Sequence, residues 1–172
     1  MLYLTRIAQM MKGVKVKELI ELLDKDLAYT GHELSGDHFT IYTCSNREEA
    51  ICPYCKKASS RIHSTYSRSF QDLPIQGKKT YINITNRKFF CDNTSCTHKT
   101  FAESFDCIKH KAKKSERLLE EILKVSVEVS SVSASRMLKN GVVDVSKSTI
   151  CDLLKKNDRS VGQGKNRENM HR

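Results

Sequence analysis

The sequence has 172 residues, the size of one ordinary domain or two small ones, and only 38% of them are hydrophobic. That share is low for one large core and favours small modules stabilised by something besides apolar burial. Thirty Lys and Arg against twenty Asp and Glu give a net charge of +10. Arg6, Gln9 and Lys12 interrupt the N-terminal apolar run, which argues against a secretory signal and a membrane span.

The positive charge is concentrated in one part of the chain. Residues 52–114 carry thirteen Lys and Arg against four Asp and Glu, and residues 155–172 carry six against two. Residues 1–51 and 115–154 are close to neutral. A basic excess on one module is typical of a polyanion-binding protein, with a merely basic soluble surface as the alternative.

The N-terminal part predicts a helix followed by a strand. Apolar residues recur at helical spacing over residues 14–29. Gly31 and Gly36 then indicate a turn region, and residues 38–44 alternate as a strand does. We therefore expect an N-terminal helical segment over residues 1–37.

The basic segment predicts a β-hairpin. Residues 61–70 form one expected strand, residues 72–77 a turn punctuated by Pro74, and residues 81–90 a second strand. A hairpin between two cysteine pairs is the zinc-ribbon arrangement, so residues 38–110 are expected to form a zinc-ribbon domain.

Three helices are predicted after the ribbon. Ser115 is suited to cap the first, Ser131 or Ser133 the second, and Ser146 the third. Asn140-Gly141 is a helix stop between the last two.

These helices suggest a helix-turn-helix domain over residues 111–157, although the connection after Asn140 is longer than the usual tight turn. Residues 158–172 are polar and lack periodicity, so we expect a disordered tail. The complete prediction is an α+β chain with an N-terminal helix, a small zinc ribbon, a three-helix module and this tail.

Four of the seven cysteines have the spacing of a structural zinc site. Cys52 and Cys55 form one close pair, and 35 residues separate it from a second pair, Cys91 and Cys96. Two such pairs supply the four ligands of one tetrahedral zinc ion and leave no position for a catalytic water. A redox role for the first pair would leave the second pair unexplained.

The other candidate ligands are weaker. His98 lies two residues after Cys96 and could replace it. Cys44, Cys107 and Cys151 lack partners at a suitable spacing and are interpreted as small apolar fillers. Because clustered cysteines outside an oxidising compartment bind metals more often than they form disulfides, we expect a cytoplasmic protein.

Basic residues lie along the expected hairpin and at the start of the third helix. Phosphate contacts need such residues on an accessible face, and the first residues of a recognition helix are those that reach base edges. The interleaved aromatic residues are interpreted as the small core of the ribbon. The candidate DNA-binding residues are Arg61, His63, Arg68, Lys78, Lys79, Arg87, Lys88, Lys147, Ser148 and Thr149.

Residues 52–103 resemble the zinc-finger region of the ISL-three family of insertion-sequence transposases, and the stretch through Lys156 looks, more loosely, like that family's helix-turn-helix. The motifs that carry the resemblance are Cys52-Pro-x-Cys55, Arg61-Ile-His63-Ser-x-Tyr66-x-Arg68, Asp72-Leu-Pro74 with Gly77, Arg87-Lys-Phe-Phe-Cys91-Asp-Asn, Cys96 and Phe101-x-Glu103.

The resemblance implies binding to double-stranded DNA at the terminal inverted repeats of an insertion sequence. In the family, a ribonuclease H-type domain with three metal-binding carboxylates follows. Because this sequence ends at Arg172, we expect a DNA-binding fragment without transposase activity. A homodimer, association with a full-length transposase, an unrelated zinc-ribbon regulator of transcription or RNA, and a decayed fragment remain open.

Overall fold

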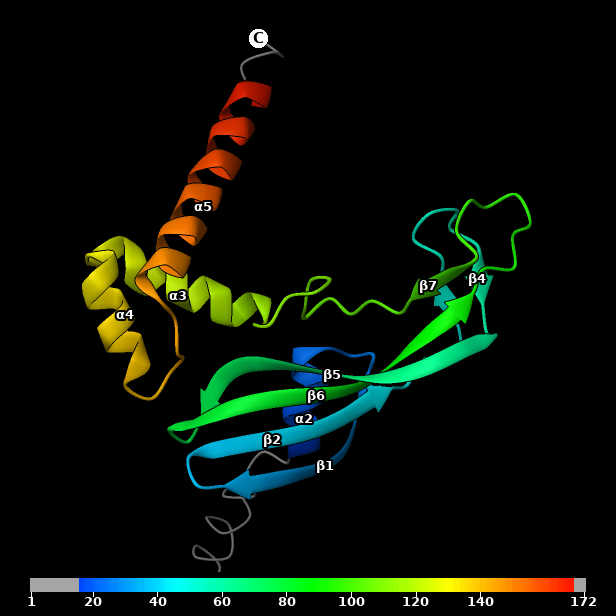
Figure 1. Cartoon of the computed structure of the whole chain (residues 1–172), viewed down its shortest axis with the longest axis horizontal. Coiled ribbons are helices and arrows are strands. Elements are labelled where there is room, and N and C mark those ends of the chain that lie inside the picture. The colour runs from blue at the N-terminus through cyan, green and yellow to red at the C-terminus, as the bar shows by residue number, and fades with distance from the viewer. Residues whose placement is uncertain (1–15, 169–172) are drawn as a thin grey trace, which may run out of the picture. The chain divides into compact units, whose positions relative to one another are not determined.

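The computed structural model in Figure 1 describes residues 16–168, with side chains as far as residue 158. As expected, the chain is α+β, with four helices and a mixed sheet in the described part. It forms two compact units. The described parts of the first unit are residues 16–31, 42–68 and 83–106, and those of the second are residues 32–41, 69–82 and 107–168.

The first helix is shorter than the sequence predicts. Helix α2 spans Val16–Leu23, and strand β1 begins at Leu27 and ends at Ser35. The helical prediction was wrong beyond residue 23, because the Asp24 carboxylate accepts a hydrogen bond from the Asp26 backbone N–H at 3.0 Å and turns the chain. Leu27 is buried as the first residue of a strand instead of as the last turn of a helix.

The main sheet has the order β1-β2-β6-β5, and the short β7 pairs with β6. Strands β2 (His38–Ser45), β5 (Ile62–Ile75) and β6 (Lys78–Phe90) are longer than expected. In β7 (Thr100–Ala102), Phe101 lies opposite Phe89 of β6 in an antiparallel register. Strands β3 (Ala50–Ile51) and β4 (Ala58–Ser59) form a separate pair.

The hairpin turn lies later than predicted. Strand β5 continues through Pro74 to Ile75, and Gln76 and Gly77 make the turn with φ of 51° and 73°. A proline lacks a backbone N–H but is tolerated here because β5 is an edge strand. The same argument explains why Pro74 did not mark the end of the strand.

Three helices follow, α3 (Glu116–Glu128), α4 (Ser131–Lys139) and α5 (Lys147–Glu168). Each of them packs against the other two. The buried residues they share with the connecting loop are aliphatic, so burial of apolar surface holds the helices together. These residues are Leu118, Ile122, Ala134, Leu138, Val143, Val145 and Ile150.

The helix caps agree with the sequence except at α4. Ser115 accepts a hydrogen bond from the Leu118 N–H at 3.2 Å, and Ser146 accepts one from the Thr149 N–H at 3.2 Å. Helix α4 is capped by Ser130, one residue before the nearer of the two predicted serines. Several neighbouring hydroxyls can cap this helix, and the sequence alone does not rank them. Gly141 ends the segment with φ of 100°, as expected.

Helix α5 extends to Glu168, into the segment that the sequence predicts as a disordered tail. Absence of apolar periodicity was the basis of that prediction. A polar helix without an apolar face can extend from a packed first turn, because its backbone hydrogen bonds propagate from the turns that precede it.

Candidate metal centre

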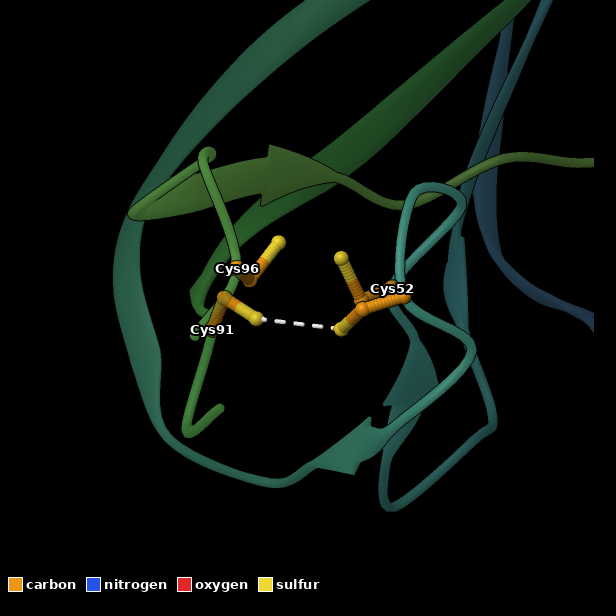
Figure 2. A group of neighbouring side chains, drawn as sticks. Cys52, Cys91 and Cys96 are labelled. Atoms are coloured by element: carbon orange, nitrogen blue, oxygen red, sulfur yellow. Dashed lines mark hydrogen bonds between the residues drawn. The ribbon is translucent and has the colours of Figure 1, made fainter. Parts of the chain in front are cut away.

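The four predicted ligands are brought together in the first unit. The sulfur atoms of Cys52, Cys55, Cys91 and Cys96 all lie within 4.8 Å of one another. Figure 2 shows the labelled side chains of Cys52, Cys91 and Cys96 converging, with a dashed line for the 3.5 Å contact between the Cys91 and Cys55 sulfurs. Four sulfurs at about 2.3 Å from one zinc ion would be about 3.8 Å apart, so the group is the right size for zinc.

Backbone hydrogen bonds shape the first of the two cysteine loops. The Cys52 carbonyl accepts from the Lys56 N–H at 2.9 Å, and the Cys52 N–H donates to the Lys57 carbonyl at 2.9 Å. Lys56, directly after the second ligand, adopts a left-handed φ of 62°, which folds the chain back toward Cys52. The loop therefore turns both sulfurs toward the same point.

The second cysteine loop joins β6 to β7. The Cys91 N–H donates to the Lys99 carbonyl at 2.8 Å and the Cys96 N–H donates to the Asn93 carbonyl at 3.0 Å. Because β7 pairs with β6 directly beyond the loop, the sheet fixes both ends of the second ligand pair.

The thiols are enclosed by a small apolar cluster. Cys52, Cys91 and Cys96 are buried together with Ala50, Phe89 and Phe101, and Cys55 is partly buried against the same cluster. Burial of this kind excludes water from the ligands. The cysteines and the stacked Phe89–Phe101 pair make up most of the core of the ribbon.

The pKa values of the Cys55 and Cys91 thiols are shifted in opposite directions. The backbone N–H of Lys57 lowers the pKa of Cys55 to about 6. The Asn93 N–H also favours a thiolate at Cys91, but burial and the neighbouring thiols outweigh it and raise the pKa of Cys91. A divalent cation at the centre would favour all four thiolates at once. The donor set therefore suits one closed, structural zinc ion.

His98 is outside this group. Its ring stacks on Tyr54 with centroids 3.4 Å apart and planes at 3°, and its Nδ1 lies 3.0 Å from the Thr97 hydroxyl. The two rings come from different cysteine loops, so the stack links the loops beside the metal ligands.

Among the described residues, Cys44, Cys107 and Cys151 do not join a metal-ligand group. Cys107 is buried, as expected of an apolar filler, whereas Cys44 and Cys151 are partly exposed.

The geometry of the centre agrees with a comparison to known families. Residues 48–96 match the family model described as the zinc-finger of transposase IS204/IS1001/IS1096/IS1165. The segment is an ISL-three transposase zinc ribbon. The match begins just before β3 and ends on the last ligand, so it contains the whole quartet. No curated protein and no solved structure matches the chain significantly.

The candidate DNA-binding residues of the zinc ribbon fall into two groups. Arg61, His63 and Lys88 are exposed, and Arg68 is partly exposed. Arg87 is different, because it lies largely inside the unit, with 16% of its side chain exposed. Its guanidinium donates to Glu103, to the Ser45 hydroxyl and to the Arg47 carbonyl. Arg87 is therefore engaged in the structure and does not present its charge to a ligand.

The candidate DNA-binding residues of the second unit also differ in whether they are exposed or engaged in contacts. Lys78 donates to the Gly36 carbonyl at 2.8 Å, and Lys79 pairs with Asp144 at 2.8 Å with 15% of its side chain exposed. The three candidates at the start of α5 are exposed, namely Lys147, Ser148 and Thr149. The hydroxyls of Ser148 and Thr149 each lie 2.9 Å from the Ser146 hydroxyl.

Sequence reasoning missed two acidic residues of the ribbon. Glu103, just after β7, is the buried partner of Arg87. Asp92, directly after Cys91, pairs with Arg61. The Ser59 hydroxyl, together with Arg61, holds the pKa of the Asp92 carboxyl below its usual range against the effect of desolvation. Both residues lie inside the motifs that carry the family resemblance. Their position in those motifs is the sequence signal that could have identified them.

None of the described helices is both long and apolar enough to cross a bilayer. The residues on which the absence of a secretory signal was argued lie outside the described part of the chain.

Proposed function

We propose that this chain is the DNA-binding part of an ISL-three transposase and binds the terminal inverted repeats of an insertion sequence. The observation that carries the proposal is the matched four-cysteine ribbon with an exposed basic surface. The zinc ion is a structural support for that surface and takes no part in a reaction.

Exposed basic residues lie in and beside the two cysteine loops, so the metal fixes them relative to one another. Lysine and arginine contacts to phosphates supply affinity and position a protein on duplex DNA. These exposed residues are Lys56, Lys57, Arg61, Lys88 and Lys99.

A second contact is proposed through helices α4 and α5, which we interpret as a helix-turn-helix. The two helices pack on the shared core and are separated by a loop that contains Gly141. The Ser146 cap leaves Lys147 and Thr149 exposed in the first turn of α5. The first turn is the part of a recognition helix that reaches base edges in the major groove.

We also propose that strand cleavage is not a property of this chain. Two-metal cleavage requires carboxylates that converge on divalent ions. Among the described residues, several buried carboxylates are already used in structural contacts: Asp72 with Arg117, Glu103 with Arg87, and Asp24 with the Asp106 backbone.

The decisive experiment is a binding titration with duplex DNA from an insertion-sequence end. Specific, salt-dependent binding that exceeds binding to a scrambled duplex by about 10³-fold or more would support the proposal. Equal binding to both duplexes would reject inverted-repeat recognition. Tighter binding to single-stranded RNA would favour the zinc-ribbon regulator instead. A cleavage assay with Mg²⁺ on the same duplex should give intact DNA.

A further inference from the structure

Arg61 is held in a fixed position on the surface of the ribbon. Its Nε and Nη2 lie 3.1 Å and 2.9 Å from the same oxygen, Oδ1 of Asp92. The guanidinium carbon lies 4.6 Å from the centroid of the Phe90 ring, which is the distance of a cation–π contact. His63 packs edge-on against the same ring, with centroids 4.8 Å apart.

The backbone of Arg61 is fixed as well. Its N–H donates to the Ser59 hydroxyl at 3.2 Å and its carbonyl accepts from the Phe90 N–H at 2.9 Å. Asp92 follows the ligand Cys91 directly, so its carboxylate is attached to the part of the ribbon that the metal holds most firmly. Both ends of the Arg61–Asp92 pair are therefore immobilised.

The exposure of this pair argues against a role in stability. The side chains of Arg61 and Asp92 are 63% and 37% exposed. Exposed ion pairs contribute about 0–1 kcal/mol to folding. The pair therefore contributes little to stability. It does orient the guanidinium, because one edge of the group faces Asp92 and one of its faces covers the Phe90 ring.

The contacts with Asp92 and Phe90 leave a specific set of Arg61 N–H donors available. A guanidinium has five N–H groups in a planar fork. With Nε and one Nη2 proton directed at Asp92, the Nη1 protons and the second Nη2 proton point away from the carboxylate. Two parallel donors at the end of an extended arginine match the O6 and N7 acceptors of guanine in the major groove.

We propose that Arg61 reads a guanine base in the major groove, and that Asp92 is the positioning residue that fixes its guanidinium for this contact. This inference rests on the proposed DNA-binding function and goes beyond it by naming a base and the residue pair that selects it. Asp92 is an anion beside a polyanion, so it weakens general attraction to DNA. A surface that contacts phosphates alone would gain nothing from it.

The test is a selection from a library of duplex oligonucleotides with randomised positions, with the zinc-loaded chain and the variants Arg61→Lys and Asp92→Ala. Lysine keeps the charge but loses the planar fork, and alanine removes only the support. Glu21→Ala is the matched control, because Glu21 is an exposed carboxylate paired with Lys17 on helix α2, outside the ribbon and the proposed helix-turn-helix. Zinc content is measured for every variant, so that loss of the ribbon is recognised directly.

If Arg61 reads guanine, both ribbon variants should lose preference for guanine at one and the same position by about tenfold, while other positions keep theirs. Asp92→Ala should at the same time bind non-specific duplex more tightly, because it removes a negative charge. Glu21→Ala should leave every base preference unchanged.

Three results would overturn the inference. A uniform gain in affinity for Asp92→Ala with no lost base preference would identify Arg61 as a phosphate contact. An unchanged preference for guanine in Arg61→Lys would also identify Arg61 as a phosphate contact. That result would hold even if Asp92→Ala lost its zinc. A lost preference for a base other than guanine would exclude the proposed pairing. By contrast, a parent chain that selects no sequence at all would contradict the proposed function itself.

Discussion

The fully buried carboxylate of Glu103 accepts two hydrogen bonds from the guanidinium of Arg87, at 3.1 Å from Nε to Oε2 and at 2.8 Å from Nη2 to Oε1. The Glu103 N–H also donates to the Arg87 carbonyl at 2.9 Å. The side-chain and backbone contacts join β6 to the segment after β7 directly behind the second cysteine loop. The Arg87 guanidinium also lies 5.0 Å from the centroid of Phe89, inside the apolar cluster of the ribbon.

Replacing Glu103 by Gln should destabilise the first unit by about 3–5 kcal/mol, because it leaves the charge of Arg87 inside the protein without its partner. Urea unfolding followed by circular dichroism measures the effect, since the chain has no Trp for fluorescence. Glu48→Gln is the control, because Glu48 is an exposed residue of the same unit and should change stability by less than about 0.5 kcal/mol. Equal effects of the two variants would contradict the structural role of the pair.

Replacing Cys91 by Ala should abolish binding of the single zinc ion and unfold the ribbon. Zinc binding by small four-ligand modules contributes on the order of 10 kcal/mol to their folding. Metal analysis of the purified chain and a thermal melt give the two readouts.

Two controls separate this prediction from a general effect of mutation. Cys151→Ala and His98→Ala should each retain one zinc per chain, because neither residue is in the four-sulfur group. Zinc loss in His98→Ala would instead identify His98 as a ligand in place of a cysteine. Full zinc content in Cys91→Ala would reject the proposed centre.

The stability of the first unit should decline at acid pH through Asp26. Its hydrogen bond to Arg47 lowers the pKa of the Asp26 carboxyl in the folded state. A lowered folded pKa means that this contribution is complete above the unfolded pKa of about 3.9 and is lost as the pH falls through the folded value. Asp26→Asn should therefore differ from the parent chain near neutral pH and converge with it as the pH falls through the folded pKa of Asp26, in acid titrations of unfolding. A constant difference at all pH values would show that the charge of Asp26 is not involved.

Replacing Gly141 by Ala should destabilise the second unit by about 1 kcal/mol, because its φ of 100° is strained for a residue with a side chain. No atom lies within 4 Å of the added Cβ, so the cost is conformational and not steric. Gly31→Ala is a matched control, since the site is equally open and no positive φ is recorded there. Thermal melting compares the two, and a larger loss for Gly31→Ala would be the contrary result.

The cysteine quartet, the starts of α3 and α5 and the stop after α4 could be predicted because their signals are local. A close cysteine pair, a serine before a helix and a glycine after one each act within a few residues. The end of α2 was missed because Asp24 interrupts an apolar spacing that continues into β1. Leu27 fits the helical pattern and is buried for a different reason.

The roles of individual arginines could not be predicted, because they depend on pairing between distant segments. Arg61 and Arg87 look equivalent in the sequence, and both belong to the basic part of the chain. Arg87 meets Glu103 only because β7 folds back on β6. Arg61 meets Asp92 only because the second cysteine loop lies beside the start of β5. Sequence alone contains the charges but not these pairings.

The separation of the two ligand pairs has a consequence for how the ribbon reaches its native register. Cys55 precedes strand β5 and Cys91 directly follows β6, so the long hairpin decides whether the sulfurs meet. A slip of one residue between the strands would turn every side chain to the opposite face and carry Cys91 away from its partners. Only the correct hairpin can then retain the ion with four ligands. Zinc binding would therefore stabilise one register of the two largely polar strands over the slipped registers.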